Sequence, residues 1–338
     1  MKSSSLSHMK TKGNASSVVG LVVFSICLIV VGWLFVNRVY VIDQLTVWQY
    51  EPSRAVQTIT ERAELSDRGR FYFYASKPEV DEASVFNQQC KKQEEHSAIL
   101  GCYAARRIFI YNVANAQLDG IKEVTAAHEL LHAAWDRLDK GEKERLGALL
   151  DKAYTKIGTD ELEERMAYYA RTQPGERANE LHSIVGTETA DLGEELETYY
   201  SQYFTDRQQI VTFHQNYASL FTQIEQRAKA VEAEMATLTS QIESGSASYN
   251  AGVSQLNADI TSFNSRAQND GFSSITTFYA ERNALIARSD SLEAQRSNIN
   301  QQVASYNTLR AELESLSAQS EALNRSIDSS LAPAPSAI

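Results

Sequence analysis

An uncharged apolar run near the N-terminus places the strongest constraint on how this chain can fold. Residues 18–36 read VVGLVVFSICLIVVGWLFV and contain no charged side chain, and about 20 apolar residues are enough to cross the hydrocarbon core of a membrane as a helix. A cleavable signal peptide has a shorter apolar core and a small-residue cleavage site, whereas this run is followed by Asn37, Arg38 and Tyr40. We therefore expect a single transmembrane helix at 18–36 rather than a signal peptide or a buried core helix.

The charges on either side of this run predict how it is oriented in a cell membrane. The preceding segment carries basic side chains and no acidic one: Lys2, Lys10 and Lys12. On the other side, Arg38 is soon followed by Asp43 and Glu51. Because positive charges favour the cytoplasmic side, we expect residues 1–17 in the cytoplasm and the chain after residue 40 outside it.

The cysteines agree with this orientation. Cys27 lies in the apolar run, and Cys90 and Cys102 flank the segment KKQEEHSAILG. Outside the cytoplasm two neighbouring cysteines usually pair, and closing a loop of this size stabilises a fold by about 3 kcal/mol. Two unpaired thiols are the alternative if the topology is reversed. Zinc binding by this pair is disfavoured, because the spacing is far from C-x2–4-C.

The overall charge excludes one broad class of function. The formal net charge is −11 and the isoelectric point is near 5.2, whereas proteins that bind nucleic acid generally need a basic surface. We therefore expect no nucleic-acid partner. The expected partners are the membrane and a protein or peptide.

Residues 41–207 read as an α+β domain that is mostly helical. The stretch RRIFIYNV (106–113) has the alternation and the β-branched and aromatic content of a strand. The turn signal LDG follows, and the remainder reads as successive helices broken at DKGEK, IGTD, TQPGE and DLGE. This length is sufficient for a hydrophobic core of its own.

Residues 208–330 show a different pattern, with apolar residues repeating at intervals of three and four. A break occurs at NDGFSS, and the run after it places apolar residues such as Phe278 and Leu285 seven positions apart. Sustained heptads on both sides of a turn predict an antiparallel coiled-coil hairpin, which suits a coiled-coil partner or a homo-oligomer. The alternative is a solvated, partly disordered helical tail, because Ser and Asn are frequent here. We expect residues 331–338 to be disordered.

The segment VTAAHELLHAAWDRL (124–138) carries the strongest chemical signal. In a helix, residues four apart lie on one face, so His128 and His132 can both direct an imidazole at one metal ion. Glu129 is rotated by about 100° and can hydrogen-bond a water at that ion. Zinc lowers the pKa of such a water to near 7, and Glu129 can take its proton as it attacks a carbonyl. Two histidines on an ordinary amphipathic helix are the alternative, but small and apolar residues surround the pair.

This motif resembles that of the HExxH zinc metallopeptidases known as zincins. The metzincin branch continues as HExxHxxGxxH, and Trp135 and Leu138 stand where it has glycine and histidine. The gluzincin branch takes its third ligand, a glutamate, from a later helix. The segment NELHSIVGT matches that pattern best through Glu180, with Ile184 where the family has aspartate. The resemblance implies a zincin-like fold, Zn²⁺ as cofactor, and a strand before the motif helix that holds the substrate backbone, for which 106–113 is the candidate.

The third metal ligand and the oxyanion donor stay open among several residues of the later helices. We expect Glu180 as the ligand. His182, in the same segment, could ligate instead or could donate a hydrogen bond to the oxyanion, and Tyr199 and Tyr200 are further candidates for that donor. The remaining candidate ligands are glutamates, whose ordinary place is a solvated helix face: Glu164, Glu188, Glu194, Glu195 and Glu197.

Together these features predict a membrane-anchored zinc endopeptidase with its catalytic domain outside the cytoplasm. Its substrates would be proteins or peptides of the cell envelope, with Glu129 as general base. A non-catalytic membrane-anchored scaffold is the main alternative, in which the hairpin carries the function and the zinc site is structural or vestigial. A third interpretation keeps the site and assigns it to hydrolysis of a cell-wall amide.

Overall fold

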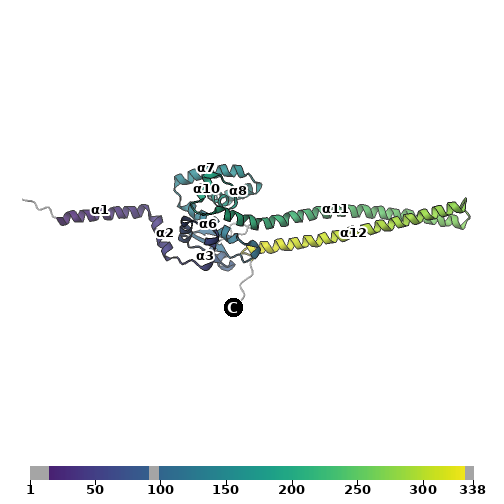
Figure 1. The fold of residues 1–338 in the computed structure, drawn as a ribbon, viewed down its shortest axis with the longest axis horizontal. Coiled ribbons are helices and arrows are strands. Elements are labelled where there is room, and N and C mark those ends of the chain that lie inside the picture. Colours follow the sequence, from purple (N-terminus) through teal and green to yellow (C-terminus); the bar gives the residue numbers. More distant parts are fainter. Residues whose placement is uncertain (1–14, 91–98, 332–338) are drawn as a thin grey trace, which may run out of the picture. The chain divides into compact units, whose positions relative to one another are not determined.

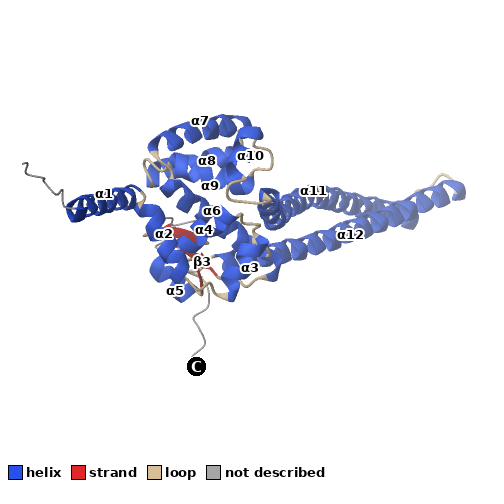
Figure 2. Ribbon diagram, turned by 60° about the vertical axis from the view of Figure 1, so that its left-hand side comes forward, coloured by secondary structure: helices blue, strands red, loops and turns tan. Residues whose placement is uncertain are grey.

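The structure is a computed structural model that describes residues 15–90 and 99–331. The described chain is mostly helical, with one small three-stranded sheet (Figure 1, Figure 2). The expected cytoplasmic segment 1–17 and the expected disordered tail 331–338 lie outside the described residues, except for 15–17 and 331.

The chain divides into two compact units. The first contains the described residues up to Ala114 together with Asp119–His214, and the second contains Asn115–Leu118 and the described residues from Gln215 onward. The first unit holds the sheet and the shorter helices. The second consists mainly of two long helices.

Helix α1 (Ala15–Val36) corresponds to the predicted transmembrane run. Its segment Val19–Val36 has a mean hydropathy of 2.8, and none of it is buried within the described chain. It is the one helix among the described residues that is long and apolar enough to cross a membrane. Signal sequences near an N-terminus share this length and composition, so the membrane anchor and its orientation both stay predictions.

Three short helices follow: α2 (Arg38–Gln49), α3 (Arg54–Arg62) and α4 (Asp67–Ala75). Serine caps begin the last two, since the hydroxyls of Ser53 and Ser66 accept hydrogen bonds from amides of the first turn. Helix α2 packs against α4. The folded part of the first unit therefore includes helical residues before 41, where the domain was expected to begin.

An ion-pair cluster around the buried pair of Asp43 and Arg137 joins α2 to the elements that carry the candidate site. Asp43 is 2% exposed and accepts hydrogen bonds from Arg137 at 2.8 and 3.1 Å and from Arg106 at 3.2 Å. Arg106 also pairs with Asp136 at 3.5 Å, which accepts a hydrogen bond from the hydroxyl of Tyr103 at 3.1 Å. Removing one partner of a buried pair leaves an uncompensated charge and costs about 3–5 kcal/mol. This cluster therefore fixes α2 within the first unit.

The sheet has the strand order β1-β3-β2, with β1 (Glu79–Asp81), β2 (Gly101–Ala104) and β3 (Arg107–Tyr111). The strand predicted at 106–113 is β3, which runs parallel to β1 and antiparallel to β2. β3 is therefore the central strand and β2 is an edge strand. Helix α5 (Ala83–Gln89) packs against β3.

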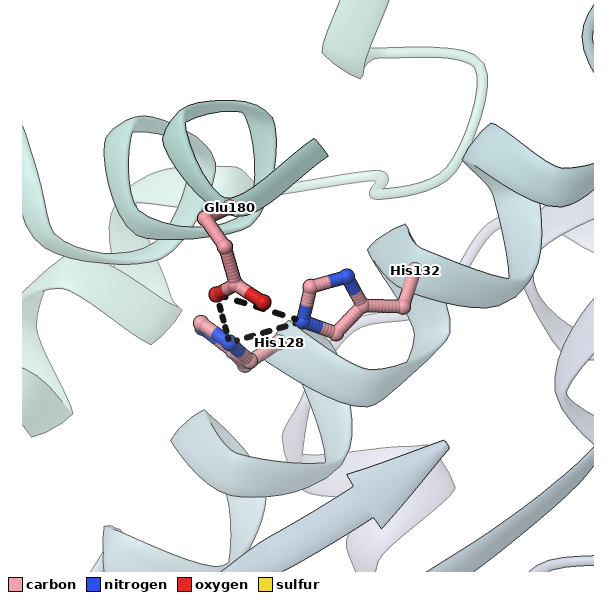
Figure 3. A group of neighbouring side chains, drawn as sticks. All are labelled: His128, His132 and Glu180. Atoms are coloured by element: carbon pink, nitrogen blue, oxygen red, sulfur yellow. Dashed lines mark hydrogen bonds and ion pairs between the residues drawn. The ribbon is translucent and has the colours of Figure 1, made fainter. Parts of the chain in front are cut away.

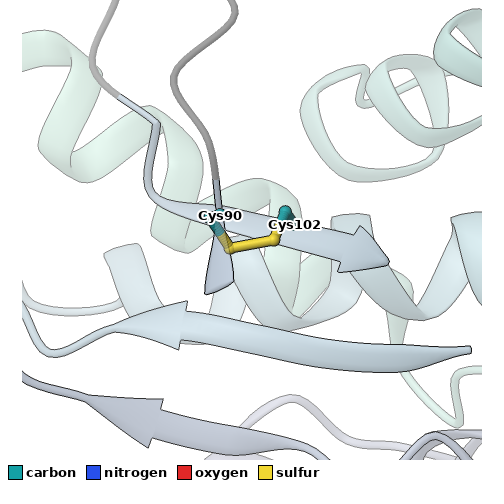
Figure 4. The surroundings of a disulfide bond; sticks show 2 residues. All are labelled: Cys90 and Cys102. Atoms are coloured by element: carbon teal, nitrogen blue, oxygen red, sulfur yellow. A yellow bond between two sulfur atoms is a disulfide. The ribbon is translucent and has the colours of Figure 1, made fainter. Parts of the chain in front are cut away.

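The predicted cysteine pair joins the end of α5 to β2 (Figure 4). The Cα atoms of Cys90 and Cys102 are 5.9 Å apart, and their sulfur atoms are at disulfide distance. Cys27 lies in α1 and is a free, exposed cysteine. The cross-link thus ties the edge strand to the helix that precedes it.

The turn between β2 and β3 adopts an unfavourable backbone conformation. Ala105 and Arg106 have φ angles of 49° and 62°, the left-handed values typical of a two-residue hairpin turn of type I′. Asn-Gly is the usual choice in such a turn, because a residue with a Cβ costs roughly 1–2 kcal/mol in this region. Arg106 in this turn forms the ion pairs with Asp43 and Asp136.

Helix α6 (Ile121–Arg137) carries the HExxH motif and packs against β2, β3, α3, α4 and α9. Its apolar face is fully buried at Leu130, Leu131, Ala133 and Ala134. The 3₁₀ helix η1 (Ala116–Leu118) precedes it, and four helices follow it: α7 (Lys140–Ile157), α8 (Asp160–Thr172), α9 (Arg177–Glu188) and α10 (Glu194–Tyr200). The close approach of α9 to α6 requires Gly186, where a Cβ would lie 2.5 Å from Cδ1 of Leu131.

The second unit is built mainly from α11 (Arg207–Gln268) and α12 (Ile275–Ile327), which run side by side in Figure 1 and Figure 2. Ion pairs cross between the helices in opposite chain order, which defines an antiparallel arrangement: Arg227–Glu312, Asp259–Arg288 and Arg266–Glu281. Near the turn, three aromatic rings pack together: Phe263, Phe272 and Phe278. The helical hairpin predicted for 208–330 is therefore present, while heptad packing of the coiled-coil type stays a prediction.

Candidate metal centre

Two histidines and one glutamate converge in the first unit (Figure 3). His128 and His132 lie one turn apart on α6, and their Nε2 atoms are 3.1 Å apart. Glu180 extends toward both from α9, with its Oε2 atom 4.0 Å from Nε2 of His128 and 3.8 Å from Nε2 of His132. Because their ligand atoms all lie within 4.8 Å of one another, these residues could hold a metal ion.

The chemistry of the three donors fits such an ion. Glu180 is 6% exposed although it lies in the first turn of α9. A buried carboxylate is stable only when its charge is compensated. Two imidazole nitrogens and a carboxylate oxygen are donor types that divalent transition metals accept, zinc among them. The donor set therefore agrees with the metal ion that the motif predicts.

Burial also favours the neutral form of one of the two histidines, His128. Desolvation lowers the pKa of His128 well below its usual value, and the nearby His132 and Arg165 act in the same direction. Metal ligation needs a neutral imidazole with a free lone pair. The surroundings of His128 therefore favour the form that binds a metal ion.

Glu129 lies beside this cluster, in contact with the edge strand. It is 6% exposed, and a Cβ on Gly101 of β2 would lie only 2.9 Å from its Oε1 atom. Burial raises the pKa of Glu129 to about 7, and Glu180 acts in the same direction, while His132 and a backbone hydrogen bond with Tyr103 lower it. A carboxyl group with such a pKa can both accept and release a proton near neutral pH.

Hydrogen bonds at the Nδ1 side of its ring orient His132. Its Nδ1 atom lies 3.0 Å from Oδ1 of Asn179 and 3.3 Å from the hydroxyl of Ser183. The Asn179 amide in turn donates to Glu176 at 3.0 Å. Because an ionised carboxylate can only accept, the amide oxygen of Asn179 faces His132, which then carries its proton on Nδ1 and keeps the Nε2 lone pair for a metal ion. Ile184, which stands where the gluzincin pattern has an aspartate, is buried in the core.

The cluster lines a pocket of about 410 Å³. Its walls come from β2 and the residues just before it, from α6, and from the end of α8 with the start of α9. The lining residues are Ile99, Gly101, Cys102, Tyr103, His128, Glu129, His132, Tyr169, Gln173, Glu176, Asn179 and Glu180. None of these side chains is a lysine or an arginine.

Among the described residues, no strand pairs with the outer backbone edge of β2, which lies beside this pocket. Tyr111 of β3 donates to the carbonyl of Leu100 at 2.8 Å, and backbone groups alternate sides along a strand in an antiparallel pair. The backbone groups of Gly101 and Tyr103 therefore point away from β3. This corrects the expectation that 106–113 holds a substrate, because β1 and β2 occupy both edges of β3.

His182 does not reach the cluster, which corrects the expectation that it acts as a ligand or oxyanion donor. It follows Glu180 by two positions, so its side chain is rotated by about 200° around α9. It is fully buried and packs on Trp135, Tyr199 and Tyr200 with ring centroids 5.4 to 5.5 Å away. Burial lowers the pKa of His182 to about 3. These aromatic residues belong to the core and do not line the pocket, so Tyr199 and Tyr200 are not oxyanion donors there either.

The remaining candidate ligands also lie elsewhere. Glu188 forms a bidentate ion pair with Arg165 at 2.7 and 2.9 Å, and Glu197 pairs with Arg207. The other three glutamates are exposed: Glu164, Glu194 and Glu195. None of the five belongs to the group that could hold a metal ion.

The zincin resemblance rests on the HExxH motif and on the position of Glu180 beside it. These few residues do not show which family the chain belongs to. The candidate metal centre rests on the geometry of His128, His132 and Glu180. No family model, curated protein or solved structure matches this chain.

Proposed function

We propose that this protein is a membrane-anchored, zinc-dependent endopeptidase whose substrates are proteins or peptides of the cell envelope. One observation carries the proposal: His128, His132 and Glu180 converge beside a pocket that also exposes the buried carboxyl group of Glu129. Two imidazoles, one carboxylate and an adjacent glutamate form the constellation of a hydrolytic zinc site. A β-strand edge along the same pocket supports a peptide as the substrate.

The residues divide the work of hydrolysis between them. A bound zinc ion would supply Lewis acidity, which acidifies water and polarises a carbonyl. His128, His132 and Glu180 would hold the ion, and Asn179 would keep the His132 ring in its ligating orientation. Glu129 would accept a proton from the attacking water and return it to the leaving amine.

The edge strand would orient the peptide. The outward backbone groups of Gly101 and Tyr103 can pair with an extended chain, as strands added to a sheet edge do. The Tyr103 amide contacts Glu129, which leaves the carbonyls of both residues and the amide of Gly101 for the substrate. Because Gly101 has no side chain, such a chain can lie close to Glu129.

The proposed location follows from α1 and from the cysteine pair. A helix of this hydropathy would cross the membrane once, with the preceding lysines in the cytoplasm. A disulfide between Cys90 and Cys102 is expected to persist only outside the cytoplasm. Both features support a catalytic domain on the outer side of a cell membrane.

A non-catalytic scaffold is the second candidate, and the long hairpin of α11 and α12 favours it. In that case the metal would be a structural element. Structural zinc sites usually have four protein ligands and are closed, whereas the residues that the structure describes supply three, beside a pocket of about 410 Å³. The open side therefore favours catalysis, on a peptide bond or on a cell-wall amide.

The test uses the full chain in detergent micelles, stripped with a chelator and reloaded with zinc. We expect about one zinc ion per chain and cleavage of casein or of a peptide library, lost on chelation and restored by zinc. Glu129→Gln should retain zinc and lose roughly 10²- to 10⁴-fold in turnover, because a general base is removed. His132→Ala should lose the zinc itself. Glu194→Gln, at an exposed position outside the pocket, is the matched control. Full proteolysis by Glu129→Gln would refute the mechanism, and zinc binding without cleavage of any peptide would favour the scaffold.

A further inference from the structure

We infer that the pocket selects peptides with a lysine or arginine side chain beside the scissile bond, recognised by Glu176 together with Tyr169 and Gln173. This inference rests on the proposed peptidase function and adds a substrate class to it. It follows from the composition of the pocket wall formed by the end of α8 and the start of α9.

That wall is built by a short reversal of the chain. Tyr169 and Gln173 lie one helical turn apart at the end of α8, and Glu176 precedes the first residue of α9. The backbone amide of Gln173 donates to the backbone carbonyl of Tyr169 at 2.8 Å. The backbone amide of Glu176 donates to the backbone carbonyl of Gln173 at 3.1 Å. Gly175, with a φ of 100°, makes the reversal possible, because only glycine adopts this angle without strain. One continuous segment therefore lines the pocket with a phenol ring, an amide and a carboxylate.

Among the described residues that line the pocket, three carry a carboxylate, Glu129, Glu176 and Glu180, and none is a lysine or arginine. The cation that acts on His128 from outside this lining, Arg165, is paired with Glu188. The proposed function uses Glu129 as base and Glu180 as ligand, which leaves Glu176 for the substrate. Oε2 of Glu176 accepts a hydrogen bond from Asn179 at 3.0 Å, and Oε1 makes no hydrogen bond with any residue that the structure describes.

These three side chains complement a basic one. The aliphatic stem of lysine or arginine can lie along an aromatic ring such as that of Tyr169, and its cation is attracted to the ring face. The amide oxygen of Gln173 and the carboxylate of Glu176 can then accept its hydrogen bonds. An acidic substrate side chain would meet like charge here, so the wall would both attract one class and repel the other.

The test compares three peptides that differ only in the residue beside the scissile bond, which is arginine, glutamine or glutamate. The protein is the zinc-loaded full chain, and the readout is the ratio of kcat/KM values between peptides. For the wild type we expect arginine to exceed glutamine by about fivefold, the effect of one partly exposed ion pair, and glutamate to be the poorest. Glu176→Gln should bring the arginine-to-glutamine ratio close to one. It removes the charge but keeps an oxygen that can accept from Asn179.

A second variant tests the inference through a gain in arginine preference, which a damaged fold would not produce. Gln173→Glu adds a carboxylate to the same wall and should raise the arginine preference above that of the wild type. Glu195→Gln, which is exposed and outside the pocket, should leave the ratio where it is. A wild type that cleaves all three peptides equally, or a Glu176→Gln variant that keeps the full arginine preference, would overturn the inference and leave the peptidase function standing. Zinc-loaded wild type that cleaves no peptide would overturn both.

Discussion

The hydrogen bond from His132 to Asn179 gives the sharpest prediction about the metal centre. Asn179→Leu keeps the approximate size of the side chain and removes the acceptor that lies 3.0 Å from Nδ1 of His132. The ring then loses the contact that fixes its tautomer and orientation. We expect zinc to bind more weakly while the fold remains intact, because Asn179 is only partly buried.

The magnitude follows from the two partners behind the ring. Loss of a polar partner of a metal-ligating histidine typically costs 10- to 100-fold in metal affinity, which is about 1.4 to 2.8 kcal/mol. Ser183 lies 3.3 Å from the same nitrogen and can take over part of the contact. We therefore expect a loss near tenfold for Asn179→Leu alone and near 100-fold for Asn179→Leu with Ser183→Ala, since coupled neighbours are not additive.

The assay is a zinc competition against a chromophoric chelator, with the full chain in detergent and thermal unfolding of the metal-free protein measured in parallel. The matched control is the double variant Asn179→Asp with Glu176→Gln. It moves the charge from one residue to the other and keeps the hydrogen bonds between them and to His132. Wild-type affinity in Asn179→Leu, with an unchanged unfolding midpoint, would show that this contact does not orient the ligand and would refute the reasoning.

Three further predictions concern the edge strand. Gly101→Ala should destabilise the fold by about 1–3 kcal/mol and slow cleavage more than it weakens zinc binding, because the new Cβ would lie 2.9 Å from Oε1 of Glu129; turnover and zinc affinity measured together test this. Ala105→Gly should stabilise the protein by roughly 0.5–1 kcal/mol, as the φ of 49° suits glycine and the gain is reduced by greater freedom in the unfolded chain; a lower denaturant midpoint would contradict it. Reduction of the Cys90–Cys102 pair should cost about 3 kcal/mol and lower the melting temperature in reductant, and a Cys90→Ser, Cys102→Ser variant should no longer respond to reductant.

Much of the candidate metal centre could be predicted from residue spacing within single helices. The spacing of His128 and His132 is a property of any helix, and the structure brings Glu180 to them, as the segment NELHS predicted. The same helical geometry argues against His182, because residues two apart point to nearly opposite sides and cannot both face one ion. Its aromatic neighbours, in contrast, come from distant segments of the chain.

Other parts of the site depend on contacts between distant segments. β2 reads GCYA, which has little strand propensity, and it is a strand because it pairs with β3. Asn179 lies inside the quoted segment, but its role depends on a ring contributed by α6. The ion pairs of Asp43 join residues far apart in the chain, and no periodicity marks a buried charge of this kind.

The position of Asp43 limits how this domain could ever be released from a membrane. Only Asn37 separates α1 from α2, and Asp43 is buried against Arg137 at the end of the motif helix. A protease that cut α2 after Asp43 would strip that arginine of its counter-charge and loosen the helix that holds both histidines, at a cost of about 3–5 kcal/mol. Shedding in an active form would therefore require a cut before Asp43. If α1 crosses a membrane as proposed, this short connection would confine the proposed peptidase to substrates that come to the membrane surface.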